Sequence, residues 1–142
     1  MVNGPNGPGN HDGPSSTNAS NQSYPTTSRG MAVSGMSTSQ KALVKTVIEA
    51  WVNNLPTATA SSLLADYESD TSMNATYMGM SSSADFSSTA GDSSIGSYFR
   101  VDGPRVWIEF VVQDGYPIST SDGKIHYHTI WRDKTTDYGA EF

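Results

Sequence analysis

Three short apolar runs near the end of the chain constrain its fold more than any other feature. They are Tyr98–Val101, Arg105–Gln113 and Lys124–Arg132, and an Asp-Gly pair lies in each connection between them. Runs rich in β-branched and aromatic residues, separated by turn residues, are typical of consecutive antiparallel strands. The sequence therefore predicts an antiparallel meander over residues 98–132.

Strand alternation divides the side chains of these runs between two faces of the sheet. In the second run, apolar residues occupy the even positions from Val106 to Val112, so Glu109 must point the other way. We expect the even positions to face the core. The opposite side of the sheet, which we call the outer face, is expected to carry aromatic, basic and acidic side chains together: Tyr98, Arg100, Trp107, Glu109, His126, His128 and Arg132.

Two amphipathic helices are expected before the meander. Ser37-Thr38-Ser39-Gln40 has the pattern of a capping box, and apolar residues follow at helical spacing until an Asn-Leu-Pro sequence ends the pattern. We expect helices over 38–53 and 59–68. The expected core comprises Leu43, Val47, Ile48, Trp51, Leu63, Leu64, Phe99, Val101, Ile108, Phe110, Tyr127 and Trp131.

These elements predict an α+β fold with two amphipathic helices packed on one face of a three- to four-stranded antiparallel sheet. Thr76–Met80 would supply the fourth strand at an edge, and the Ser-rich, low-complexity residues 81–97 an exposed, mobile loop. The first part of the chain is rich in Gly, Pro, Asn and Ser and can bury little apolar area. We therefore divide the chain into an irregular leader, 1–36, and an α+β domain, 37–142.

Composition excludes several classes of protein. The 142 residues carry a net charge of -6, which argues against nucleic acid as a partner. The chain has no cysteine, so disulfides and cysteine-ligated zinc are excluded. It has no apolar run of membrane-spanning length, and its start lacks the basic and apolar regions of a signal peptide. We expect no membrane span.

One group of residues on the outer face suggests a metal site. His126 and His128 would project from one strand about 7 Å apart, and Glu109 on the neighbouring strand would complete a set that could hold a divalent metal. The same residues also fit an ordinary polar surface, in which a cross-strand pair contributes about 0.2–1 kcal/mol. No serine lies in a Gly-x-Ser-x-Gly elbow, so no catalytic residue is assigned.

Two stretches carry a resemblance to a known family. They are Tyr98-Phe-Arg-Val-Asp-Gly-Pro-Arg-Val-Trp-Ile-Glu-Phe-Val-Val-Gln113 and Ile125-His-Tyr-His-Thr-Ile-Trp-Arg-Asp-Lys134. In both, the chain resembles the C-terminal part of a bacterial family, domain of unknown function 3500, and the resemblance continues through Val44–Val52 and Leu63–Asp70. It implies a bacterial, exported protein. It supplies no activity and no catalytic residue.

We expect a non-enzymatic extracellular or periplasmic module that binds another protein chain or a second copy of itself. Aromatic residues and arginine together on a flat face are the composition of an interface centre. The leader could lie along an edge strand or the outer face, as in strand addition. No cofactor is expected. The alternative is a metal-binding domain or a metal-dependent enzyme that uses His126, His128 and Glu109.

Overall fold

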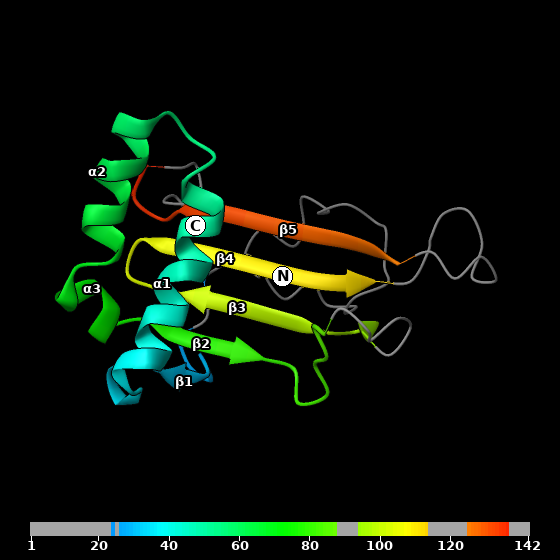
Figure 1. Cartoon of the computed structure of the whole chain (residues 1–142). Coiled ribbons are helices and arrows are strands. Elements are labelled where there is room, and N and C mark those ends of the chain that lie inside the picture. The colour runs from blue at the N-terminus through cyan, green and yellow to red at the C-terminus, as the bar shows by residue number, and fades with distance from the viewer. Residues whose placement is uncertain (1–23, 25, 88–93, 114–124, 137–142) are drawn as a thin grey trace, which may run out of the picture.

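The computed structural model describes Tyr24 and residues 26–87, 94–113 and 125–136, and it confirms the α+β fold. The sheet has five antiparallel strands in the order β1-β2-β3-β4-β5 (Figure 1), which corrects the expected three or four. The strands are β1 Met31–Ala32, β2 Tyr77–Met80, β3 Tyr98–Asp102, β4 Val106–Gln113 and β5 His126–Asp133. The additional strand, β1, comes from the range assigned to the leader and places β2 inside the sheet.

The meander has the expected register. Phe99 pairs with Phe110, and Ile108 pairs with both Val101 and Trp131. Residues that oppose each other in an antiparallel sheet project to the same face, so the even positions of β4 share the helix side with these partners. Glu109 therefore projects to the outer face, as expected.

Three α-helices form the second layer: α1 Thr38–Val52, α2 Thr57–Tyr67 and α3 Asp70–Asn74. The capping box is confirmed, because the Ser37 hydroxyl accepts a hydrogen bond from the Gln40 amide at 3.3 Å. The Gln40 side chain in turn accepts one from the Ser37 amide at 2.9 Å. The sequence pattern did not predict α3, since a helix of five residues is too short to display helical periodicity. A 3-10 turn, η2 Val33–Gly35, precedes α1.

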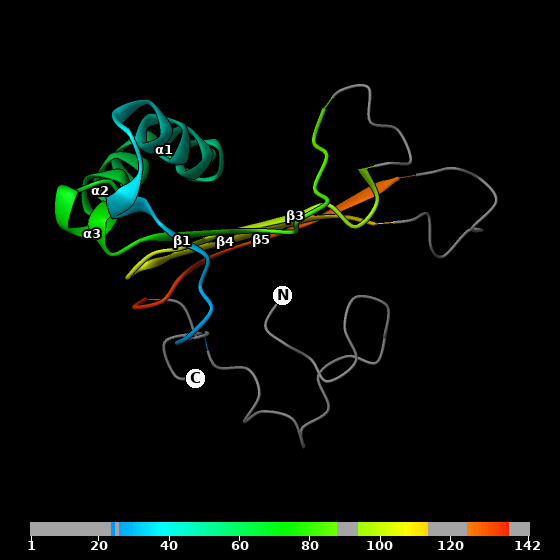
Figure 2. The same cartoon turned by 90° about the horizontal axis from the view of Figure 1, so that it is seen from below.

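The helices cover one end of one face of the sheet, and β3, β4 and β5 extend beyond them (Figure 2). Val44, Ile48 and Val52 form the buried stripe of α1. Leu43 was expected in the core, but it is 67% exposed because it is offset from that stripe by one residue, about 100° around the helix. The buried apolar residues that form the main core are Val33, Val44, Ile48, Val52, Ala60, Tyr67, Met73, Val101, Val106 and Ile108.

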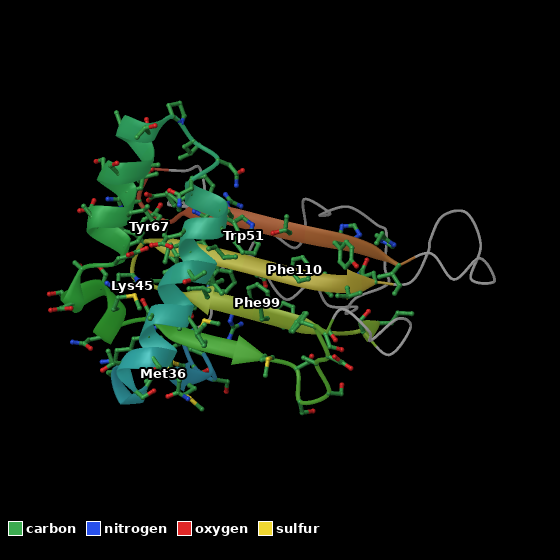
Figure 3. The ribbon with its side chains drawn as sticks, viewed as in Figure 1. Met36, Lys45, Trp51, Tyr67, Phe99 and Phe110 are labelled. Carbon is green, nitrogen blue, oxygen red and sulfur yellow. The ribbon has the colours of Figure 1, made fainter. Side chains whose placement is uncertain are left out.

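A row of aromatic rings lies on the helix side of the sheet. It begins at Phe99, which packs edge-on against Trp51 of α1, and continues past the helix layer through Phe110 (Figure 3). Phe110 stacks between Phe99 and Tyr127, with ring centroids 5.5 Å and 5.6 Å apart, and Phe86 packs edge-on against Phe99 and Phe110. Tyr127 was expected in the core but is 64% exposed. It faces the helix side as alternation requires, and the helix layer does not reach it. We call Phe86, Phe99, Phe110 and Tyr127 the aromatic row.

Two serines of the low-complexity range 81–97 are buried, although most of its described residues are not. Ser97 is 1% exposed, and its hydroxyl accepts a hydrogen bond from the Asp85 amide at 2.8 Å. Ser94 is also buried. The expectation of an exposed loop is therefore wrong for Ser94 and Ser97. It holds for the exposed residues Ser82, Ser83, Phe86, Ser87, Ile95 and Gly96, while positions 88–93 lie outside the described residues.

Candidate functional site

The outer face brings together the residues that the sequence assigned to it. Across β3, β4 and β5, Tyr98 lies opposite Val111, which opposes His128, and Arg100 lies opposite Glu109, which opposes Ile130. Trp107 lies between Asp102 and Arg132, and Gln113 opposes His126. The face therefore contains a polar and aromatic centre on β3 and β4 and a histidine pair at the β5 edge.

Trp107 is the centre of this face and is almost completely buried, although none of the described helices lies on that side. Its exposed fraction is 1%. The ring of Tyr24 packs on it at a centroid distance of 5.0 Å, and Lys134 and Arg100 lie 5.2 Å and 5.3 Å from the Trp107 ring centroid. An aromatic ring and two cations, with cation–π attraction, thus surround the indole.

Asp102, at the end of β3, anchors the same region through two cations. Arg29 donates two hydrogen bonds to its carboxylate, at 2.6 Å and 2.8 Å, and a third to its carbonyl oxygen at 3.0 Å. Lys134 donates to the carboxylate at 2.6 Å and to the Gly103 carbonyl at 2.8 Å. The Asp102 side chain is fully buried. A charge in this position requires a cationic partner, because an unpaired buried carboxylate is strongly destabilising, and Asp102 has two.

The pKa values of this triad follow from burial and pairing. Burial would raise the pKa of Asp102, but the hydrogen bonds from Arg29 and Lys134 outweigh it and hold that pKa below its ordinary value. For Lys134, burial lowers the pKa and outweighs the attraction of Asp102. For Arg29, the hydrogen bond to Asp102 raises the pKa. We take Asp102 as ionised and both bases as protonated at neutral pH.

Tyr24 and residues 26–30, which we call the latch segment, run from the outer face to β1 (Figure 2). Arg100 donates a hydrogen bond to the Ser28 carbonyl at 3.2 Å. Ser28 has a φ of 53° and Gly30 a φ of 108°, so the backbone turns sharply here. A Cβ on Gly30 would lie 2.1 Å from the Met78 carbonyl oxygen, so this close approach to β2 requires glycine.

Glu109 is buried on the outer face beside the Trp107 centre. It is 3% exposed, and the Tyr98 hydroxyl donates a hydrogen bond of 2.6 Å to its carboxylate. Burial raises the pKa of Tyr98, so this hydroxyl keeps its proton and remains a donor. Arg100 opposes Glu109 across the strands. The carboxylate is therefore part of a buried polar network.

The two histidines do not join Glu109 in a metal-binding group. Their rings contact each other at a centroid distance of 4.8 Å, while Glu109 opposes Ile130 and bonds to Tyr98. Within the ranges that the structure describes, no three His, Cys, Asp or Glu side chains are placed to hold a metal ion. The metal hypothesis gains no support from this geometry.

Sequence reasoning missed Asp102 and Arg29 as parts of this face. Asp102 precedes a glycine, so the pair indicated a hairpin turn, and Arg29 stood in a segment with no periodic pattern. The sequence nevertheless contains a pattern that could have identified Asp102. Asp102 falls on the same alternating positions as Arg100 and Tyr98, so strand alternation alone places it on the outer face.

Comparison with models of known protein families gives a match over most of the chain. The family model described as "Protein of unknown function (DUF3500)" matches residues 10–140, which confirms the resemblance seen in the sequence. The comparisons with curated proteins and with solved structures found no match. Among the described residues, no helix is long and apolar enough to cross a membrane.

Proposed function

Since the chain belongs to the DUF3500 family of proteins of unknown function, we propose its role from its geometry: a non-enzymatic module whose outer face binds an extended segment of protein chain. In this structure, the occupant is the latch segment of the same molecule. The corresponding segment of a second copy or of another protein could occupy the same place. We further propose that the protein acts outside the cytoplasm, in the periplasm or the extracellular space.

The burial of Trp107 is the observation that carries this proposal. A large aromatic side chain on the face opposite the helices is 1% exposed, and a residue 83 positions earlier in the sequence, Tyr24, packs on it. The latch segment contacts the face through an aromatic pair and through the ion pair of Arg29 with the buried Asp102, and the strand that follows it, β1, pairs with β2 over two residues. These are the interactions by which sheets bind extended peptides.

Self-assembly follows from the same contacts if the latch segment moves from its own outer face to that of a neighbour. Exchange of an identical element between copies preserves every contact and needs no new surface. The Tyr24 contact with Trp107 and the Arg29 bond to Asp102 would then form between molecules. We therefore propose that the outer face can bind either the latch segment of its own chain or the latch segment of a second copy.

Deletion of residues 1–30 tests the proposal. The truncated chain should fold, because α1, α2 and the meander remain and Lys134 still pairs with Asp102. It should associate beyond the state of the full chain or lose solubility, since Trp107 becomes exposed. Size-exclusion chromatography with light scattering measures this. Equal mass and equal solubility for the two chains would contradict the proposal.

A peptide added in trans sharpens the test. A synthetic peptide of residues 20–30 should bind the truncated chain, change its tryptophan fluorescence and reverse the association. The same peptide with Arg29→Ala should bind more weakly, because the Asp102 carboxylate loses its bidentate partner. A peptide with Thr27→Ala, an exposed position, is the matched control. Equal binding by all three peptides would show that the latch contacts are not the basis of recognition.

A metal titration separates this proposal from the metal-dependent alternative. Binding of a divalent ion at His126, His128 and Glu109 would raise the melting temperature of the full chain in proportion to its affinity. We expect no shift with Zn²⁺ or Mn²⁺. A saturable rise that His128→Ala abolishes would return the metal hypothesis to consideration.

A further inference from the structure

The two edges of the sheet differ greatly in length. β1 has two residues, whereas β5 has eight, and in the described part of the chain β5 has a strand neighbour on one side, β4. We propose that β5 pairs with β5 of a second copy of the chain, antiparallel and centred on His128, so that two sheets join into one. This inference goes beyond the proposed function, because it concerns a different surface.

The exposure along β5 defines which residues a partner strand would cover. Residues 127–130 are exposed, with Tyr127 at 64% and Ile130 at 40%, and His126 is intermediate. Toward the other end, Trp131 and Arg132 are intermediate and Asp133 is buried. The accessible stretch is therefore 126–130, and His128 is its midpoint.

The backbone of this stretch offers hydrogen-bonding groups to a partner. The Lys134 amide donates to the Arg105 carbonyl at 2.7 Å, and antiparallel ladders alternate between hydrogen-bonded and non-hydrogen-bonded pairs. The even residues of β5 therefore bond to β4, and the odd residues direct their amide and carbonyl groups toward the free edge. Tyr127 and Thr129 present these groups within the exposed stretch.

The exposed stretch also lacks the usual protection of an edge strand. Natural edges are blocked by lysine, by proline or by charged side chains that point inward. Residues 126–130 are His-Tyr-His-Thr-Ile and include no lysine, proline or carboxylate. An unprotected edge with an exposed Tyr127 and Ile130 is suited to pairing with another strand.

A second copy fits this edge because the pairing is self-complementary. A two-fold axis perpendicular to the sheet keeps each face on the same side, so residues of equal parity must oppose each other. With His128 at the axis, Tyr127 opposes Thr129 of the second copy and His126 opposes its Ile130. Because β1 has two residues, it is too short to serve as the partner of β5.

This register also continues the aromatic row across the interface. Within one chain, Phe110 opposes Thr129 and stacks on Tyr127, two residues before Thr129. In the proposed pair, Tyr127 opposes Thr129 of the second copy, so the two Tyr127 rings occupy that same diagonal relation. The pairing would cover Tyr127, the most exposed ring of the aromatic row. This would explain why Tyr127 is exposed in the single chain.

Single cysteines introduced into the full chain test the pairing and its register, because the natural sequence has none. The two His128 positions would form a non-hydrogen-bonded pair with Cα atoms about 4.5 Å apart, within the range of a disulfide. His128→Cys should therefore give covalent dimers under mild oxidation. The two His126 positions would be offset by four residues, about 13 Å, so His126→Cys should remain monomeric on a non-reducing gel. Ser62→Cys, exposed on α2, gives the background rate.

Sedimentation velocity supplies an independent measurement. The wild-type chain should sediment with twice the chain mass, and Tyr127→Lys should shift it to a single chain. Leu43→Lys, at an equally exposed apolar position on α1, should leave the dimer intact. Cross-linking of His128→Cys at the Ser62→Cys rate, faster cross-linking of His126→Cys, or a wild-type chain that sediments as a monomer would each overturn the proposal. None of these results depends on the latch segment. A negative result would therefore contradict the β5 pairing without contradicting the proposed binding of the latch segment.

Discussion

Two neighbouring residues on β4 provide a quantitative test of where the core ends. Ile108 and Phe110 project to the same face, but Ile108 is fully buried beneath the helices and Phe110 is partly exposed in the aromatic row. Ile108→Ala should cost about 2–5 kcal/mol of unfolding free energy, the range for truncation of a buried aliphatic side chain. Phe110→Ala should cost roughly 1.5–2.5 kcal/mol, about half the value for a buried phenylalanine.

Urea unfolding followed by circular dichroism measures both changes, with the midpoint converted at constant m and the protein concentration held fixed. Leu43→Ala is the control, because a residue 67% exposed should change stability by less than about 0.5 kcal/mol. A larger loss for Phe110→Ala than for Ile108→Ala would refute the reasoning. It would mean that the aromatic row is the true core and that the helix-covered end is secondary.

Three further predictions concern the cap and the buried ion pairs. Ser37→Ala should lower stability by about 1 kcal/mol in urea unfolding, because it removes the acceptor for the Gln40 amide. Tyr67→Phe should lower it by about 1–2 kcal/mol, because the Tyr67 hydroxyl donates to the Asp133 carboxylate at 2.9 Å. Thermal melting should show stability that falls as the pH is lowered below about 4. Burial would raise the pKa of Asp102 and Asp133, but their hydrogen bonds outweigh it and hold both below the unfolded value, so their contribution is lost as the pH falls. Asp102→Asn should flatten this acid limb.

The meander and its faces could be predicted from the sequence because alternation has a period of two and leaves little freedom of register. Alternation assigned Glu109 and Phe110 to opposite faces correctly. It could not tell how far the helix layer extends over the sheet, which is why Tyr127 was placed in the core. Strand β1 could not be predicted, because it has two residues and so short a strand shows no periodic pattern.

The sequence predicted which residues lie on the outer face, but it did not predict which residues bury them. Alternation put Trp107 there, and the aromatic residues beside it suggested that the leader or a partner chain covers this face, but no pattern showed which residues do so. Its burial depends on Tyr24 and Arg29, which lie more than 70 positions away from their partners in a segment without periodicity. Contacts of this kind depend on the path of the chain after folding, which local patterns do not encode.

The separation between Arg29 and Asp102, 73 positions along the chain, has a consequence for the order of folding. The capping box of α1 and the hairpin of β3 and β4 form from neighbours, whereas the Arg29 contact closes a long loop and gains nothing until the sheet exists. We therefore expect the latch segment to dock last. Until it does, Trp107 of the folding intermediate is exposed to any nearby chain. Two molecules synthesised side by side could exchange their latch segments during this period.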